Sequence, residues 1–143
     1  VEEAQKMAAR SEEAAIQAGM PEYRGTALAN RAWAMWRQGD FPQAAKMGQA
    51  AMEQWEKLPA GHASCAFEWT GLLPLLAIAA SEDEVQLAVG YCRALLDPVR
   101  MRLKESLEES LEKAVCSWEV NQPDTARDEL IRSVKLAEEF GYL

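Results

Sequence analysis

The side chains that could perform acid–base, metal or thiol chemistry are few and scattered along the chain. His62 is the only histidine and follows a glycine at an expected helix start, so neither a histidine relay nor a histidine-rich metal site is indicated. Cys65, Cys92 and Cys116 are odd in number, far apart and without a Cys-x-x-Cys pair, which argues against disulfides and a thiolate metal site. We expect all three cysteines to pack as small apolar side chains.

Two runs of acidic residues could in principle share protons or hold a cation. They are residues 82–84 and the series Glu105, Glu108, Glu109 and Glu112. Both runs open expected helices, where carboxylates favour the positive end of the helix dipole, and Glu109 has the spacing of a surface ion pair with Lys113. We therefore expect both runs to lie on solvent-exposed helix surface.

The chain also lacks the Gly-x-x-x-x-Gly-Lys-Ser/Thr loop that holds nucleotide phosphates. Together with the scattered reactive residues, this absence predicts a protein that is not an enzyme and that uses no cofactor and no metal.

Length and composition narrow the class of protein further. The chain has 143 residues, 49% hydrophobic and 27% charged, which fits one soluble domain over residues 1–143. Its net charge of −8 repels phosphate backbones and anionic lipid, so we expect neither nucleic acid nor a membrane surface as a partner. The longest apolar stretch, residues 71–80, is too short to cross a bilayer. Unpaired cysteines favour the cytoplasm, and a start at Val1 without a signal peptide favours a fragment of a larger protein.

The pattern of apolar residues predicts helices throughout. No segment alternates with a period of two, whereas apolar residues recur at three- and four-residue steps between Gly, Pro and Asn breaks. Pro74 is expected to kink the fourth helix, and Ser81 with Glu84 has the spacing of a capping box that opens the fifth. The expected helices cover about residues 2–18, 21–38, 41–58, 62–80, 81–96, 105–120 and 123–140.

Two of the helix junctions repeat the same order of residues. The first has Trp36, a Gly39-Asp40 turn and Pro42, and the second has Trp118, an Asn121-Gln122 turn and Pro123. Asn121 replaces Gly39, as expected where the chain must adopt a left-handed conformation. Helix starts recur near residues 2, 42, 82 and 123, a period of about 40 that predicts a right-handed solenoid of antiparallel helical hairpins.

The segment from Ala32 to Met52 resembles a tetratricopeptide repeat, with its small and large residues, its Gly-Asp-aromatic turn, and Ala44 and Ala51 on the following helix. The order of four further segments (28–40, 67–76, 94–98 and 136–143) is similar to the C-terminal tetratricopeptide-like region of large bacterial regulators. In that family an ATPase module is joined to a class III adenylate/guanylate cyclase domain or to a DNA-binding transcriptional activator domain. The resemblance implies that any ATPase or cyclase activity lies outside this segment.

The same resemblance implies a partner-binding groove. The first helix of each tetratricopeptide hairpin lines a concave groove, and an arginine beside aromatic anchors suits a peptide or helix. The pattern equally allows the tryptophans to pack between hairpins. Carried onto this sequence, the groove residues are Ala29, Trp33, Trp36, Arg37, Trp69, Thr70 and Leu73.

These observations favour a non-catalytic regulatory module of a bacterial signalling or transcription protein, whose partner is a protein or peptide, including upstream domains of the same chain. The alternative is a small-molecule sensor, in which the helix containing Pro74 and its tryptophan and leucine neighbours enclose an apolar ligand in a closed cavity near Trp69. The first helix carries Met7, Ala8 and Ile16 on a face that an upstream helix or a second copy in a dimer would cover.

Overall fold

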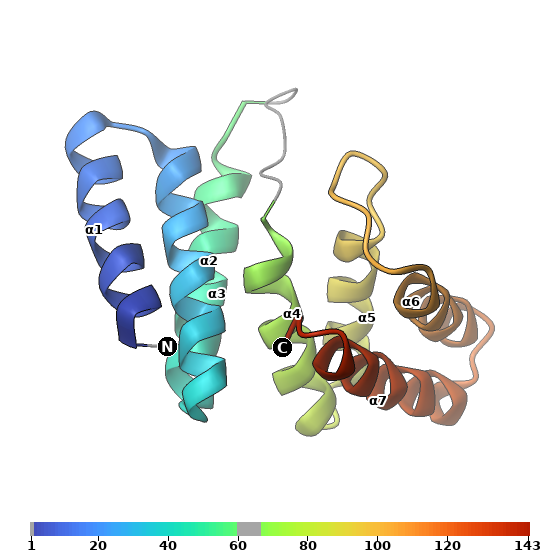
Figure 1. The fold of residues 1–143 in the computed structure, drawn as a ribbon. Coiled ribbons are helices and arrows are strands. Elements are labelled where there is room, and N and C mark those ends of the chain that lie inside the picture. The colour runs from blue at the N-terminus through green and yellow to red at the C-terminus, as the bar shows by residue number, and fades with distance from the viewer. Residues whose placement is uncertain (1, 60–66) are drawn as a thin grey trace. The chain divides into compact units, whose positions relative to one another are not determined.

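The computed structural model describes residues 2–59 and 67–143, and these residues form seven α-helices and no strands (Figure 1). The predicted all-α class is thereby confirmed. Two compact units make up the chain, unit 1 up to Pro74 and unit 2 from Leu75 to Leu143. No helix among the described residues has both the length and the apolar character needed to cross a membrane. The helices are α1 (Glu2–Ala18), α2 (Pro21–Gln38), α3 (Phe41–Glu56), α4 (Trp69–Ser81), α5 (Val85–Leu95), α6 (Glu105–Glu119) and α7 (Pro123–Glu139).

The two junctions that repeat in sequence have the same backbone conformation. Gly39, between α2 and α3, has φ of 78°, and Asn121, between α6 and α7, has φ of 59°. Each donates its amide N–H three residues back, Gly39 to the carbonyl of Trp36 at 2.9 Å and Asn121 to that of Trp118 at 3.1 Å. The left-handed conformation predicted for Asn121 is confirmed, and it lets the chain reverse at once into a helix that begins with proline.

The capping box predicted at residues 81–84 is wrong. Ser81 is the last residue of α4, and its hydroxyl donates to the carbonyl of Ile78 at 2.7 Å. Asp83 then makes a left-handed turn with φ of 60°, and α5 begins only at Val85, after an N-cap Glu84 that makes no side-chain cap bond. Serine can bond back to a preceding carbonyl as well as cap a following helix, so its spacing to a glutamate did not identify the helix start.

The start of α4 also differs from the prediction. A helix was expected from residue 62, and residues 60–66, which include His62 and Cys65, lie outside the described residues. Phe67 and Glu68 form a turn, and the Thr70 hydroxyl donates to the carbonyl of Phe67 at 2.7 Å. Pro74 lies inside α4, as expected.

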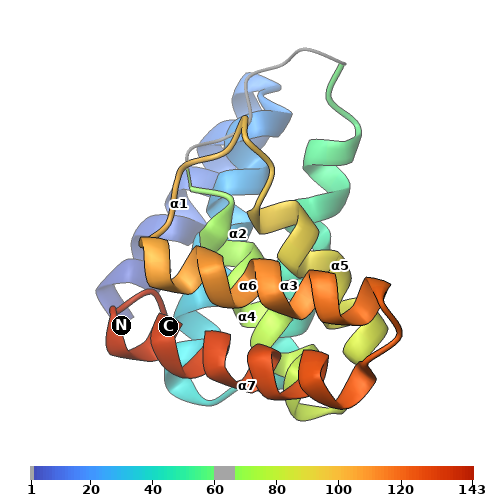
Figure 2. The same ribbon diagram turned by 90° about the vertical axis from the view of Figure 1, so that its right-hand side faces the viewer.

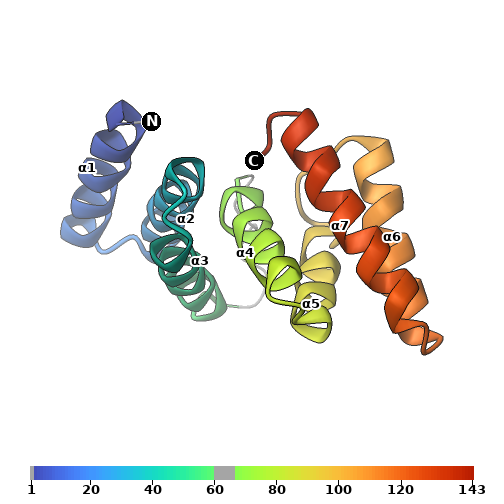
Figure 3. The same cartoon turned by 90° about the horizontal axis from the view of Figure 1, so that it is seen from below.

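Unit 1 is built on close contacts between small residues. Helices α1, α2 and α3 run in alternating directions, and α2 packs against both of its neighbours (Figures 1 and 3). The core joins Leu28 and Ala29 of α2 to Ala51 of α3. A Cβ placed on Gly71 of α4 would lie 3.2 Å from the Cβ of Ala29, so these two helices approach closely. The alanine stripes of this part of the sequence are therefore packing surfaces.

Unit 2 has a more aliphatic interior. Helices α6 and α7 lie side by side in opposite directions, and α5 contacts both (Figure 2). Leu107 and Leu111 of α6 and Leu130 of α7 are almost completely buried. The hydroxyl of Ser133 donates to that of Ser110 at 3.0 Å, so the polar groups buried between α6 and α7 are paired.

One carboxylate of the acidic series on α6 is buried. Glu108 is 7% exposed, and it accepts hydrogen bonds from the Leu103 amide at 2.8 Å and from Arg102 Nε at 3.0 Å. The prediction that the whole series is solvated surface is therefore wrong at Glu108. Here the carboxylate holds the segment between α5 and α6 against the start of α6.

The cysteines differ in their surroundings. Cys92 is buried, and this burial raises the pKa of its thiol to about 12, whereas Cys116 is exposed and is not the core residue that was expected. Because the thiolate is the reactive form, we expect N-ethylmaleimide at pH 8 to alkylate Cys116 and to leave Cys92 unmodified until the chain unfolds. Peptide mass mapping of native and urea-unfolded protein checks this, and equal native labelling of Cys92 and Cys116 would contradict it.

Candidate functional site

Three of the seven predicted groove residues lie in the interior. Ala29 and Leu73 have no exposed surface, and Thr70 is 6% exposed. Ala29 contacts the Gly71 region of α4, and the Thr70 hydroxyl is bonded to the turn that precedes the helix. These residues pack helices together and offer no contact surface to a partner.

The other predicted groove residues are more accessible but form local contacts. The guanidinium of Arg37 lies 5.5 Å from the centre of the Trp33 ring, one helical turn away on α2. The Trp36 ring lies 4.8 Å from that of Phe41, across the turn between α2 and α3. Trp69 is half-buried at the start of α4. The structure thus places Trp33 and Trp36 in two separate aromatic contacts.

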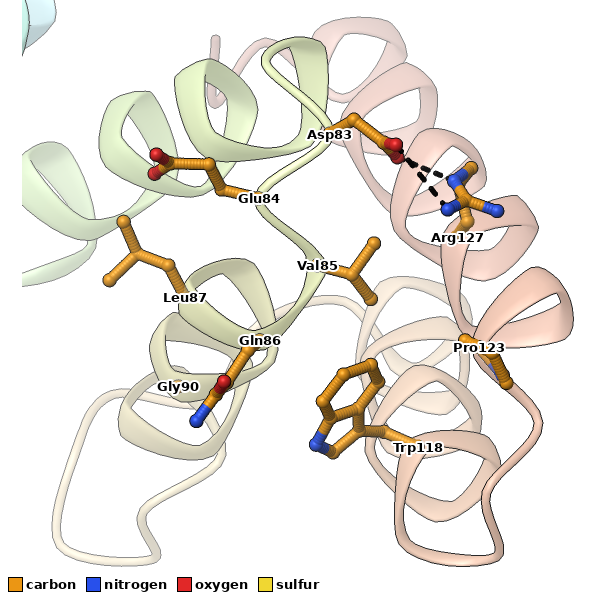
Figure 4. Close-up of a pocket in the computed structure, with 9 residues that line it drawn as sticks. All are labelled: Asp83, Glu84, Val85, Gln86, Leu87, Gly90, Trp118, Pro123 and Arg127. Atoms are coloured by element: carbon orange, nitrogen blue, oxygen red, sulfur yellow. Dashed lines mark hydrogen bonds and ion pairs between the residues drawn. The ribbon is translucent and has the colours of Figure 1, made fainter.

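A surface hollow of about 720 Å³ lies in unit 2, where α5, α6 and α7 meet (Figure 4). We call it the Trp118 hollow, after the half-buried tryptophan near the end of α6. Side chains from α6 and α7 form one side, and the first turns of α5 form the other. The residues that line it are Asp83, Glu84, Val85, Gln86, Leu87, Gly90, Trp118, Pro123 and Arg127.

Gly90 leaves one wall of this hollow open. It lies inside α5, and a Cβ built on it would meet nothing within 4 Å. A glycine inside a helix costs about 1 kcal/mol relative to alanine. Gly90 is not among the glycines with a positive φ, so its backbone conformation does not require glycine. The room at Gly90 therefore adds to the space in front of Trp118.

The apolar wall of the hollow is partly exposed. Leu87 of α5 is 44% exposed, and Trp118 is half-buried. Pro123 at the start of α7 is exposed beside them. An exposed aliphatic residue, a tryptophan and a proline within one concave surface give a partner apolar area to bury.

Carboxylates dominate the rim. Arg127 donates to Asp83 from Nε at 2.5 Å and to Asp124 from Nη1 at 2.7 Å, and these two hydrogen bonds raise the pKa of the Arg127 guanidinium. The Arg127 charge is therefore already engaged by two carboxylates. The Glu84 carboxylate makes no hydrogen bond or ion pair with other residues in the described part of the chain. Burial of Tyr91 raises the pKa of its hydroxyl, and the negative charge of Glu84 adds to this rise. The rim as a whole is acidic.

This hollow was not predicted from the sequence. Trp118 and Pro123 were recognised as markers of a repeated turn, and residues 82–84 were assigned to a helix start. The one sequence signal at the site was Gly90, because a glycine inside an otherwise periodic helix indicates a packing or binding reason.

Two smaller hollows lie on the described part of unit 1. One of about 390 Å³ lies between α1 and α2 and includes the exposed Tyr23, and one of about 230 Å³ lies at the turn between these helices and includes Arg24. The predicted open face of α1 is exposed at Met7 and Ile16, at 55% and 54%, but Ala8 is buried. None of the three hollows is lined by Trp33, Trp36 or Trp69.

The residues that line the Trp118 hollow are mainly apolar and acidic. Its lining includes no histidine and no cysteine, and no group of three or more metal-ligating side chains that could hold a metal ion is found among residues 2–59 and 67–143. What it offers is apolar surface, an open helix wall at Gly90 and an acidic rim. The chain matches no family model, no curated protein and no solved structure.

Proposed function

We propose that this chain is a non-catalytic interaction module that binds a segment of a partner protein. The observation that carries the proposal is the Trp118 hollow, in which Trp118 and Leu87 present apolar surface beside the open wall at Gly90. Binding energy at protein interfaces is concentrated in a few aromatic and aliphatic anchors seated in concave pockets. A hollow with a tryptophan wall and no reactive side chain suits such an anchor better than it suits a substrate undergoing reaction.

The proposal extends to the kind of protein that contains the module. The matching turns at Gly39 and Asn121 support a chain built from related helical hairpins. Helical-hairpin repeats form extended surfaces for protein partners. Together with the resemblance of the sequence to bacterial tetratricopeptide-like regulators, this supports a cytoplasmic regulatory segment of a signalling or transcription protein, with the partner segment in another domain of the same protein or in a separate chain.

A matched pair of variants at Gly90 tests the proposal. A phage-displayed random dodecamer library is selected on the wild-type chain, and the enriched peptides are tested on Gly90→Trp and Gly90→Ala. The tryptophan fills the hollow, so we expect it to weaken binding at least about tenfold, since it removes the apolar burial of an anchor side chain. Gly90→Ala adds only one methyl and is expected to retain binding. Failure to enrich any peptide that binds the wild type and not Gly90→Trp would contradict the proposed function.

A small-molecule sensor is the second candidate. The hollow between α1 and α2 favours it, because its volume of about 390 Å³ lies in the range of ligand pockets and most of its lining is apolar. A ligand bound there would perturb Tyr23 and would bind Gly90→Trp as well as the wild type. That pattern would distinguish sensing in unit 1 from partner binding in unit 2.

A further inference from the structure

We propose that the partner segment is cationic, with a Lys or Arg placed beside Glu84 and an apolar anchor packed on Trp118 and Leu87. The inference rests on the proposed function, since it specifies the chemistry of the segment that the Trp118 hollow binds. The charges and contacts of the residues that line that hollow support it.

The charge around the hollow is strongly unbalanced. Asp83, Glu84 and the neighbouring Asp124 contribute three carboxylates, whereas Arg127 is the only basic residue among those that line the hollow in the described structure. Glu82, which directly precedes Asp83 in the same turn, is also exposed. A positively charged partner would meet complementary potential here, and such potentials determine which partners associate and how fast.

Glu84 is the carboxylate available for a new ion pair. Asp83 and Asp124 both hold Arg127, whereas the Glu84 carboxylate has no hydrogen-bond partner among the described residues and lies at the rim near Leu87. Figure 4 shows Glu84 and Leu87 on one side of the first turns of α5, with their side chains directed away from Trp118, which lies on the other side. Glu84, Leu87 and Trp118 nevertheless line the same hollow, and the position of a Cβ on Gly90 is open. An apolar anchor seated over Gly90 can therefore contact Leu87 and Trp118 while a neighbouring lysine or arginine of the partner, with its long apolar stem, reaches Glu84.

An anionic partner fits the site poorly. A carboxylate or phosphate would have to take Arg127 from Asp83 and Asp124, and it would approach the acidic turn at residues 82–84. The N-terminus of α5, which could otherwise attract an anion, already has Glu84 as its N-cap residue. Like-charge contacts of this kind are a means by which interfaces reject wrong partners.

The test uses two dodecamer libraries that differ only in the residue fixed at two positions, lysine in one and glutamate in the other. Each is selected on the wild-type chain and counter-selected on Gly90→Trp. We expect the lysine library to enrich and the glutamate library to fail. For the enriched peptides, Glu84→Gln is expected to raise the dissociation constant about three- to fivefold, in the upper part of the range for an exposed ion pair.

The matched control is Glu138→Gln, which removes one exposed carboxylate of α7 outside the residues that line the hollow. It changes the net charge equally and is expected to leave affinity unchanged. Glutamate-library peptides that bind the wild type but not Gly90→Trp would overturn the cationic inference and leave the proposed function standing. Equal effects of Glu84→Gln and Glu138→Gln on affinity would have the same meaning. Failure of both libraries would overturn the inference and the proposed function together.

Discussion

Replacing Glu108 with alanine is expected to lower the free energy of unfolding of the chain by about 2–3 kcal/mol, because the change leaves a buried amide without a hydrogen-bond partner. The Glu108 carboxylate is 7% exposed and accepts from the amide of Leu103, which is itself buried, and from the guanidinium of Arg102. Most of the effect comes from the amide, since the Arg102 side chain is 80% exposed and its ion pair is screened by water.

Urea unfolding followed by circular dichroism measures this loss. Glu105→Ala is the control, because Glu105 belongs to the same acidic series on α6 and is exposed. Its effect is expected to stay within about 0.5 kcal/mol, as is usual for surface changes. Equal destabilisation by Glu105→Ala and Glu108→Ala would contradict this. It would show that negative charge near the start of α6 stabilises the chain and that the hydrogen bond to the Leu103 amide adds nothing.

The same substitution, glycine to alanine, is expected to have opposite effects at two helical positions. A Cβ on Gly25 of α2 would lie 2.4 Å from Nε1 of Trp55 and 2.8 Å from two carbons of its ring. Trp55 packs against the core of unit 1, so its displacement is expected to cost about 1–3 kcal/mol, more than the helix propensity that alanine gains. At Gly90, where a Cβ meets nothing within 4 Å, alanine is expected to stabilise the chain by about 1 kcal/mol.

Thermal unfolding of the two variants beside the wild type checks this pair. Tm is expected to fall for Gly25→Ala and to rise for Gly90→Ala. Each variant is the control for the other, because the change in side chain and in helix propensity is identical. A rise in Tm for both would mean that Trp55 moves aside without cost, and a fall for Gly90→Ala would mean that the space at Gly90 is occupied in solution.

Periodicity and turn chemistry predicted the all-helical class and most of the helices. Apolar spacing located the helices, and the swap of Asn121 for Gly39 identified two equivalent left-handed turns, because few other residues adopt that conformation. The wrong predictions concern segments whose local residue pattern is compatible with two different structures. Ser81 with Glu84 suits a helix start, yet the serine closes α4. Glu108 lies among exposed glutamates, and only its contact with the folded-back Leu103 segment shows why it is buried.

The candidate site was less accessible to sequence reasoning. A repeat pattern identifies which helix face turns toward a neighbour, but it does not show how closely the neighbour packs, so Ala29 and Leu73 were expected in an open groove and are buried. The Trp118 hollow joins the first turns of α5 to the α6/α7 junction, about 30 residues further along the chain. Only tertiary packing brings Glu84, Leu87 and Trp118 to one surface.

The most direct test of partner binding at the Trp118 hollow is to record the indole N–H signals of the five tryptophans by ¹⁵N NMR while adding an enriched lysine-library peptide. Single Trp→Phe variants assign the signals. If the peptide binds at the Trp118 hollow, the Trp118 signal is expected to shift and the signals of Trp33 and Trp36 are expected to stay unchanged. Shifts at Trp33 and Trp36 with Trp118 unmoved would contradict it and would place binding at the groove inferred from the tetratricopeptide resemblance.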